Sequence, residues 1–554
     1  MYKILTRLHT LKPGVFRFHM IQNDQGEWVE YIADSLDEVE LEAIKILERV
    51  GALDLKVVQE EPYYVDVRYS EDEDFNPDNE EARALALLNY IGWGDLKISD
   101  NKPYTVDLHW GVREEEKKEK YYIDITSPIV CQFEPRYMDG IVEGSSRSTT
   151  ITFIQPVDSF HLIINGEEVE GLPSWIEYMS LSDTQGVLTF KGITQNYDIE
   201  VVVDGDFDAD MTSIDEDGNI YHSITEAIQQ SNSTIKLLAD EEINEPISSD
   251  KDISIDLMGY GLIGDVDGQV FSLTDKGTGA THNINITNSS SHEGLILGGV
   301  DVVSSGDNYR VNIGKNVRIL AANPLYFRGT GEEEQYICNL EGILEATPDS
   351  GYAVFQGNGN AGKGGSVLNI KGGQLIHPNG EAIYQPQNGV INIYDGLIEG
   401  NTAIAMKRGT LNMYGGTIHA IGNYYDPAEA NNNGSEHTGA AISLISHDGY
   451  LGSMEINIEG GDIISDYGYG LYEGIPVNNG KPASEDSHIK HINITGGRFY
   501  GEEGALEIQK TRDYDITGGK YNTNVDKFVK TPYEVCVNYD TDRHNYPFTV
   551  EELS

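Results

Sequence analysis

A short phrase recurs between Asn285 and Asp515: an apolar residue, Asn, a second apolar residue and then a turn that contains Gly. Its copies are roughly one coil of a repeat fold apart, and units that recur at such a period stack on one another. In a strand, the two apolar residues of each copy point to one side and the Asn to the other. The clearest copies begin at Leu368, Ile391, Leu411, Ile456 and Ile492, and a last copy at Tyr514 has Asp in place of Asn.

A second phrase, a small residue followed by an apolar one, alternates with the first, as in Ala382-Ile383 and Ala403-Ile404. Each coil therefore holds at least two strands, and neighbouring coils are expected to pair as parallel strands. Extended backwards to Asp256, the repeat gives about ten coils and a rod on the order of 45 Å long. The sequence thus predicts a mainly β chain built around a parallel coil.

The start of this array carries a family resemblance. The segment 253–259 resembles the opening of pectate-lyase-like right-handed parallel β-helix domains in phage fibre and spike proteins and in gut bacterial surface proteins. The resemblance covers about residues 217–522 through the repeat pattern, without a catalytic signature. It implies a right-handed β-helix over residues 223–530, followed by a tail or cap over residues 531–554. A helix after Ser223, which opens a capping box, is expected to plug the open end.

The first 115 residues contain an internal duplication, since residues 43–69 match residues 84–110 at a constant offset of 41. Each copy shows a helical pattern that ends at Gly and then two short alternating strands. We therefore expect a pseudo-symmetric α+β domain over residues 1–115. Docking onto another protein is its favoured role, and a spacer with no partner is the alternative.

Residues 116–205 alternate short β-runs with turns, which is typical of a small β-sandwich. The stretch 172–176, which includes Trp175, and the strand-like segment 186–190 resemble the Trp-centred pattern of BACON domains, Ig-like modules common in gut Bacteroidetes and their phages. This resemblance implies an Ig-like module. We expect Trp175 to pack in its core and not to serve as a ligand platform.

Alternate carboxylates between residues 204 and 215 have the spacing of oxygen ligands around Ca²⁺. The sixth position of this loop is Ala209 in place of Gly, and the twelfth is Asp in place of a bidentate Glu. A solvated acidic linker over residues 206–222 is therefore the favoured interpretation, with calcium as the alternative and no other cofactor expected. The candidate metal ligands are Asp204, Asp206, Asp208, Asp210 and Asp215.

The chain is strongly acidic, with 38 Lys and Arg against 91 Asp and Glu and a net charge of −53. Such a chain repels phosphate backbones and anionic lipid headgroups, so neither nucleic acid nor a membrane is an expected partner. Its three Cys residues are scattered, which predicts buried thiols and neither a disulfide framework nor a zinc site. Residues 1–7 lack the apolar stretch of a signal peptide, which predicts release into the cytoplasm if Met1 is the natural start.

Insertions show where the coil varies. Three of them follow the small-apolar phrase, at 356–366, 447–453 and 473–489, and a fourth covers roughly 422–438. Because three leave the coil at the same corner, their loops are expected to form a lateral binding surface. All four Trp residues precede the coil, so Tyr must supply any aromatic contact with a sugar there. The candidate ligand-binding residues are Tyr424, Tyr425, Tyr467, Tyr469 and Tyr472.

Two pairs of charged residues hold matching positions on successive coils. Glu399 and His419 each lie seven residues after their respective Asn, so we expect them to be adjacent. They are the candidate catalytic pair, with ordinary surface pairing as the favoured interpretation. The paired Asp residues, Gly-His-Gly and Arg-x-Lys of polygalacturonase-type enzymes are not found in the sequence. Asp462 and Arg498 share a second outward position and are expected to form an ion pair.

These observations together favour a non-enzymatic structural protein of a phage virion, a head or tail fibre or spike assembled in the host cytoplasm. Residues 1–115 would dock to other virion proteins, and the coil would bind a glycan or protein of the host surface. The alternatives are a polysaccharide depolymerase on the same scaffold, an adhesin on a bacterial cell surface, and a decoration protein without a ligand. Analogy with phage β-helices implies a homotrimer.

Overall fold

The computed structural model describes two parts of the chain to different extents. Up to residue 119 it describes six strands, whose backbone pairing alone is considered below. From residue 120 to 553 it describes the whole chain except residues 156, 170, 275–276, 305, 329–335, 358–364, 424–437, 447–449, 451, 476–485 and 540–544. The chain divides into two compact units, Met1–Lys120 and Tyr121–Ser554.

The first unit contains a four-stranded antiparallel sheet in which the sequence duplication reappears as pairing register. In the first copy Lys56 pairs with Asp66, and in the second copy Lys97 pairs with Asp107. The two hairpins meet where Asp66 pairs with Asp107. The helical patterns expected in each copy lie outside the described residues. The strands are β1 Phe16–Met20, β2 Val29–Ala33, β3 Ala52–Glu60, β4 Tyr63–Tyr69, β5 Gly94–Ile98 and β6 Thr105–Trp110, with the sheet order β3-β4-β6-β5.

The second unit begins with two sheets around one buried core, where the sequence predicts a sandwich. Their orders are β13-β14-β10-β8 and β12-β11-β15-β7-β9. Trp175 packs against this core and stacks on Tyr197 at 4.3 Å between ring centroids. The strands are β7 Lys120–Thr126, β8 Cys131–Glu134, β9 Tyr137–Val142, β10 Arg147–Phe153, β11 Ser159–Ile164, β12 Glu167–Glu168, β13 Ile176–Ser180, β14 Gln185–Phe190 and β15 Tyr197–Asp204.

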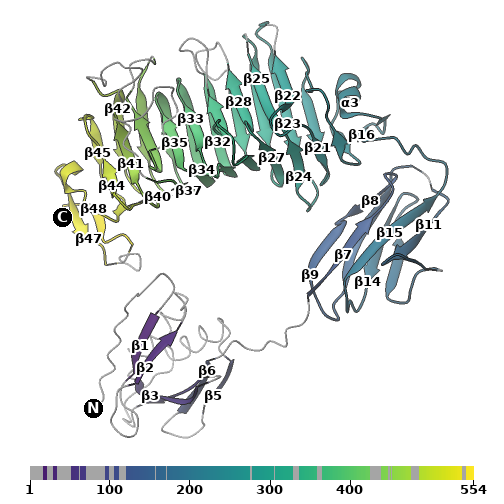
Figure 1. Ribbon diagram of the computed structural model, residues 1–554, viewed down its shortest axis with the longest axis horizontal. Helices are drawn as coiled ribbons and strands as arrows, with labels where there is room; N and C mark the ends of the chain where they lie inside the picture. Colours follow the sequence, from purple (N-terminus) through teal and green to yellow (C-terminus); the bar gives the residue numbers. More distant parts are fainter. Residues whose placement is uncertain are drawn as a thin grey trace. The chain divides into compact units, whose positions relative to one another are not determined.

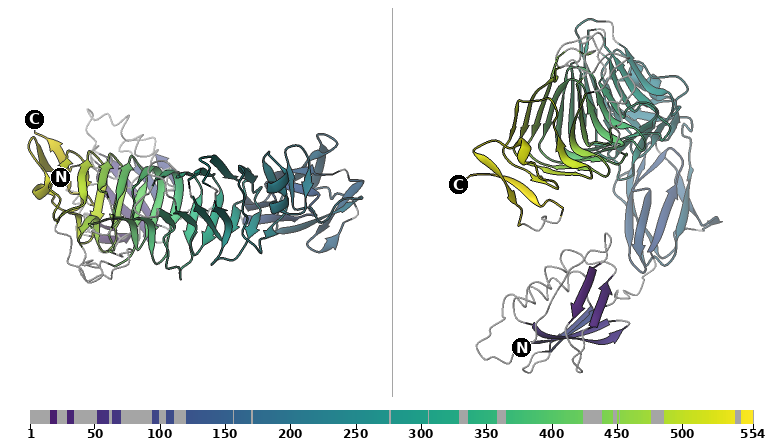
Figure 2. Two further views of the ribbon diagram at one scale, coloured as in Figure 1. Left: turned by 90° about the horizontal axis from the view of Figure 1, so that it is seen from above. Right: turned by 60° about the vertical axis from the view of Figure 1, so that its left-hand side comes forward.

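The rest of the unit is a long stack of parallel strands, which we call the coil (Figure 1; Figure 2, left). The parallel pairing predicted from the repeat is confirmed, and the arrangement is compatible with a β-helix-like fold. Each turn of the coil contributes three strands, one more than the minimum that the two phrases indicate. We call them the Asn strand, the second strand and the third strand, in chain order.

The Asn strands and second strands belong to one 24-stranded sheet, which also includes two short strands at its start and two at its end, and the third strands form a nine-stranded sheet. Asn strands are β18 Ile235–Leu237, β20 Ile253–Asp256, β23 Thr281–Thr287, β26 Asn308–Ile313, β29 Tyr336–Leu340, β32 Ser366–Ile376, β34 Gly389–Gly400, β36 Gly409–Met413, β39 Met454–Ile458, β42 Ile489–Ile494 and β45 Tyr514–Ile516. Second strands are β19 Glu241–Glu242, β21 Gly261–Ile263, β24 Gly294–Leu297, β27 Val317–Ala321, β30 Ile343–Ala346, the later parts of β32 and β34, β37 Thr417–Ala420, β40 Asp462–Ser465, β43 Arg498–Gly501 and β46 Lys520–Tyr521. Third strands are β22 Gln269–Thr274, β25 Gly299–Val303, β28 Leu325–Arg328, β31 Phe355–Gly357, β33 Glu381–Gln385, β35 Thr402–Met406, β38 Ile442–Ile445, β41 Tyr469–Gly474 and β44 Gly504–Glu507.

The repeated Asn residues form a ladder on the outside of the Asn strands. Asn392 donates from Nδ2 to Oδ1 of Asn369 at 2.8 Å, and Asn412 donates in the same sense to Asn392 at 2.9 Å. Four further bonds continue this ladder from Asn285 to Asn457. The flanking apolar residues of each phrase are buried in the core of the coil. The predicted directions, apolar inward and Asn outward, are therefore observed.

Both ends of the coil are covered. The helix expected after Ser223 is α3, Ile224–Gln230, and the Ser223 hydroxyl accepts a hydrogen bond from the backbone N–H of Glu226. Figure 1 shows it at the start of the stack. At the other end η3, Asp526–Phe528, is followed by an antiparallel hairpin, β47 Tyr533–Val537 and β48 Phe548–Glu552. β48 pairs with the last second strand.

Residues 206–222 are not the solvated linker that the sequence favours. They contain β16, Ser213–Asp215, and β17, Ile220–Tyr221, which pair with each other, and β16 also pairs with β18 of the coil. Apolar residues between the carboxylates account for this difference, because Met211 and Tyr221 are buried. The parallel sheet system therefore begins at Ser213.

Candidate functional site

Three of the four predicted insertions leave the coil where a third strand turns into the next Asn strand, and we call this edge the loop corner. β31 is joined to β32 there, β38 to β39, and β41 to β42. The interiors of these insertions lie outside the described residues, but their ends are described. Buried polar side chains lie along this edge in several turns, and most of them contact the ends of the insertions.

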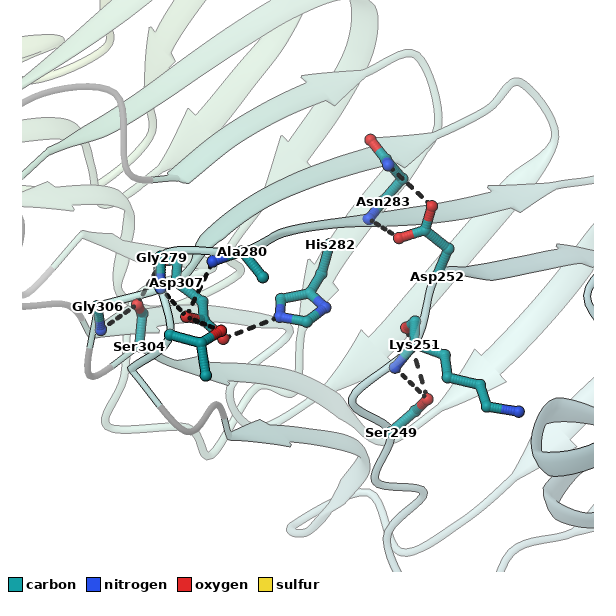
Figure 3. Close-up of polar contacts among 11 residues, drawn as sticks. Ser249, Lys251, Asp252, Gly279, Ala280, His282, Asn283, Ser304, Gly306 and Asp307 are labelled. Atoms are coloured by element: carbon teal, nitrogen blue, oxygen red, sulfur yellow. Dashed lines mark hydrogen bonds and ion pairs between the residues drawn. The ribbon is translucent and has the colours of Figure 1, made fainter.

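The first of these contacts is centred on Asp307, which lies between β25 and β26 (Figure 3). Its carboxylate accepts hydrogen bonds from the backbone N–H groups of Gly279 and Ala280, at 2.7 and 3.2 Å. His282 Nε2 lies 3.1 Å from its other oxygen, and both side chains are buried. Burial alone would raise the pKa of Asp307, but hydrogen bonds from His282, Thr278 and Gly279 outweigh it and lower the pKa to about 2. Asp307 therefore joins the corners of two successive turns as a charged acceptor.

Three turns further, Gln385 occupies the corner. It is 1% exposed, and its Nε2 donates to the backbone oxygen of Gln387 at 2.7 Å. The amide fits because glycine stands on either side of it: a Cβ at Gly357 would lie 2.7 Å from Oε1, and one at Gly389 would lie 2.8 Å from Nε2. The ends of the 358–364 insertion are thus packed against a neighbouring polar side chain.

The next contact fixes Tyr450, which belongs to the 447–453 insertion. Its hydroxyl lies 3.1 Å from that of Tyr384, and the Lys407 ammonium lies 5.3 Å from its ring centroid. Arg408 donates from Nη2 to the Tyr450 backbone oxygen. Lys407 and Arg408 are fully buried, which is uncommon for cations unless they are partnered. Three interactions therefore hold this one residue of the insertion.

The last contact closes the base of the 473–489 insertion. Glu473, fully buried at the end of β41, accepts hydrogen bonds from the Ser487 hydroxyl at 2.7 Å and from the backbone N–H groups of Gln509 and Lys510 at 2.8 Å each. Thr511 donates to the same carboxylate from its backbone and its hydroxyl. The loop thus leaves and returns at one buried anion, which also secures the next turn.

The predicted pair Glu399 and His419 is brought together, on the outer face of the second strands. The two residues are register partners, and His419 Nδ1 lies 3.0 Å from the Glu399 carboxylate. A third member, missed from the sequence, is Asp466, whose Oδ1 lies 3.0 Å from His419 Nε2. Asp466 is the first residue after β40, the second strand that follows β37 in the sheet. It lies outside the strand positions that the repeat specifies, so the repeat gave no signal for it.

This arrangement does not suit glycoside hydrolysis. Two catalytic carboxyl groups need the sugar, and in the inverting case also a water molecule, in the space between them. Here the imidazole of His419 fills the space between Glu399 and Asp466 and occupies both carboxylates. The three side chains therefore link successive turns of the coil, as ordinary surface pairing would. The expected ion pair between Asp462 and Arg498 is also present, with both carboxylate oxygens engaged.

The candidate tyrosines are distributed over several environments. Tyr424 and Tyr425 lie outside the described residues. Tyr467 is 51% exposed, whereas Tyr472 is only 2% exposed and stacks on Tyr469 at 5.4 Å between centroids. Tyr472 is thus a packing residue, and Tyr467 is a residue that a ligand can reach.

Two exposed tyrosines were not singled out from the sequence. Tyr394 and Tyr414 are 48% and 45% exposed, and their rings stack at 5.2 Å with an angle of 11° between planes. Each follows directly after an apolar-Asn-apolar phrase, in adjacent turns. That shared position was a usable signal, since residues at equal places in adjacent turns lie side by side.

The five candidate calcium ligands are not brought together. Asp204 pairs with the Ser159 hydroxyl at 2.7 Å, and Asp208 with His222 at 2.9 Å. Asp206 and Asp210 are exposed. Asp215 is buried and accepts from the backbone N–H of Asn219 and the hydroxyl of Tyr221, and these bonds outweigh burial and lower its pKa. Across the described residues no three His, Cys, Asp or Glu are grouped so that they could hold a metal ion.

Two of the three cysteines are buried, as expected. Burial raises the pKa of Cys131 and of Cys338 to about 12, so both thiols are protonated near neutral pH. Cys536 is half-buried. Within the described residues, no helix is both long and apolar enough to span a bilayer.

Comparison of the chain with protein-family models, with curated proteins and with solved structures found no match. The pectate-lyase-like and BACON-like resemblances of the sequence therefore stay predictions.

Proposed function

We propose that this chain is a non-enzymatic fibre or spike protein of a phage virion that binds a glycan or protein of the host surface. In this proposal the coil is a right-handed β-helix of the pectate-lyase-like kind with about ten rungs. The segment 116–205 is an Ig-like spacer. Residues 1–115 dock to other virion proteins, and three copies of the chain associate as in other phage β-helices.

The observation that supports this proposal is the row of buried polar contacts at the loop corner. Glu473 and the Lys407-Arg408 pair are buried charges that serve the bases of insertions. Burying a charge costs free energy, so such groups are stabilising only when fully partnered. Buried charged side chains hold the ends of these loops, so the coil is suited to present the loops in a fixed place, as a binding scaffold needs.

Binding of the full chain to host cells tests this role. Replacing residues 476–485 with a Gly-Ser segment of equal length removes loop chemistry at the loop corner. Replacing residues 540–544, which connect β47 to β48, with a Gly-Ser segment of equal length is the control. We expect the first variant to bind at least tenfold more weakly and the control to bind as the parent does. Equal binding by all three proteins would refute the presentation of ligands at this corner.

The virion assignment has its own test. Detection of the chain in purified phage particles by mass spectrometry supports it. Recovery of a processed form anchored to a bacterial envelope contradicts it and favours the adhesin. A chain that is present in particles but binds neither host cells nor a glycan array is a decoration protein.

A depolymerase on the same scaffold is the second candidate to be tested, since Glu399 and Asp466 both lie on the outer face although His419 stands between them. Incubation with host capsule, read as new reducing ends or unsaturated products, separates it from a binding protein. We expect no release above buffer. Release that disappears in Glu399→Gln would establish the enzyme.

A further inference from the structure

We propose that the outer face of the Asn strands β32, β34 and β36 binds a neutral linear glycan that lies along the axis of the coil. This inference rests on the proposed function, since it names the ligand class and a second surface of the same binding protein. Three parallel rows of outward residues form the face, and each row contributes a different property.

The central row is the Asn ladder. An amide has two N–H groups and two acceptor positions. Asn369, Asn392 and Asn412 each use one N–H and one acceptor position within the ladder. These side chains are half-buried, and the ladder leaves one N–H and one acceptor position of each amide available to another partner. The floor of the face therefore offers a donor and an acceptor in every turn, which is the pairing that sugar hydroxyls require.

Over the same turns the two flanking rows carry no net charge, because the charged residues there are Lys371 and its register partner Asp395, which have opposite signs. Alternation along β34 puts Val390, Asn392 and Tyr394 on one face. Tyr394 and Tyr414 form one side, nearly half exposed and stacked on each other. In the described part of the chain neither tyrosine hydroxyl has a hydrogen-bond partner. Val367, Val390 and Thr410 form the other side, in register with one another.

The lack of net charge on this strip decides the ligand class. The whole chain carries −53, so an anionic polysaccharide is repelled wherever it approaches. A neutral glycan is not repelled and finds amide and hydroxyl partners on the strip. Turns repeat about every 4.8 Å along the axis, close to the length of one sugar unit in an extended β-linked chain. Successive sugars can therefore meet equivalent groups in successive turns.

Isothermal titration of the full chain with cellohexaose and with β-1,4-mannohexaose tests the inference, with hexagalacturonate as the anionic comparison. We expect binding of at least one neutral hexamer and none of hexagalacturonate. The double variant Tyr394→Ala/Tyr414→Ala should weaken that binding at least tenfold. Tyr352→Ala is the matched control, because Tyr352 is exposed to a similar extent, 57%, but lies outside the strip. It should bind as the parent does.

Three results would overturn the inference: no binding of either neutral hexamer, equal binding by the double variant and the parent, or equal binding of hexagalacturonate. Circular dichroism of each variant checks that the coil is retained, and the exposure of both tyrosines makes them tolerant of substitution. Host-cell binding measured in parallel distinguishes the two proposals. If cells are bound through the 476–485 loop while the hexamers are not, the strip is refuted and the proposed function stands.

Discussion

A single amide in each turn sets the register of the coil. Asn can donate to the turn before it and accept from the turn after it, whereas a carboxylate can only accept. At Asn392 the pattern is complete, with one bond given to Asn369 and one received from Asn412. A slip of one residue would turn these amides inward and the buried Ile391 and Ile393 outward.

Asn392→Asp removes the donor from the middle of the ladder and keeps the shape of the side chain. We expect the free energy of unfolding to fall by about 1–3 kcal/mol, because the Oδ1 of Asn369 loses its partner in a half-buried site. Val390→Thr, an outward change on the same strand, should stay within about 0.5 kcal/mol of the parent. Urea unfolding measures both, and equal stability of the two variants would contradict the ladder.

Asp307 makes the stability of the loop corner depend on acid. Its pKa is lowered to about 2 from an ordinary 3.8, so the folded state favours the charged carboxylate. The resulting stabilisation is fully present above about pH 4 and is lost as the pH falls through about 2. Asp307→Asn should lower the unfolding temperature at pH 6, and the difference in unfolding temperature between the variant and the parent should be smaller near pH 2. A difference that is the same at both pH values would show that the charge of the carboxylate does not stabilise the fold.

Residue positions that follow the repeat were predictable, and those in turns were not. The contact of Glu399 with His419 and the ion pair of Asp462 with Arg498 follow from equal spacing after the Asn. The contact of Asp466 with His419 was not predicted, because Asp466 lies just beyond its strand, where the conformation of the connecting segment sets the direction of the side chain. Neither the favoured acidic linker nor the alternative calcium site describes Asp215, because acidic spacing alone does not reveal a neighbouring hydroxyl and amide that satisfy its carboxylate.

At the scale of elements, the parallel pairing was predictable, but the second strand of each turn was not. The second strands are as short as the segment 374–376 of β32, which pairs with β30. A strand this short follows the Asn phrase almost directly, and it has too few residues to show an alternation of apolar and polar residues. In the first unit the duplication predicted two like hairpins, and their register agrees: Lys56 with Asp66, and Lys97 with Asp107.

The turn glycines allow adjacent turns to approach closely. Gly396 has φ +116°, and a Cβ there would lie 2.1 Å from the backbone oxygen of Gly373. Gly372 also has positive φ, +101°, but a Cβ there meets nothing within 4 Å. Gly372→Ala should therefore cost about 1–2 kcal/mol from the backbone conformation alone. Gly396→Ala should cost clearly more, and chemical denaturation of the pair measures the difference. Equal losses would show that the turns do not approach so closely.

The loop corner depends on the carboxylate oxygens of Glu473 as hydrogen-bond acceptors. Glu473→Gln places an N–H where the backbone N–H groups of Gln509 and Lys510 point. We expect a loss of about 2–3 kcal/mol and faster proteolysis within residues 476–485, because the base of the insertion is released. Glu459→Gln, an exposed change in the same part of the coil, is the control. Protease resistance equal to that of the parent would contradict the role of Glu473.

At the scale of the whole molecule, sequence and structure agree on a mainly β chain with a long parallel coil. Both ends of the coil are covered, by α3 and by the β47–β48 hairpin, so edge pairing with further strands is blocked. The heavy acidic charge leaves few surfaces where another molecule can approach without repulsion. The face of the Asn strands β32, β34 and β36 is the place where we propose that a neutral ligand approaches.

One measurement tests binding without cleavage most directly: the full chain is incubated with host cells, and bound protein and released reducing ends are read from the same sample. The account predicts saturable binding with no reducing ends above buffer. Reducing ends that accumulate with time, and that vanish in Glu399→Gln, would contradict it.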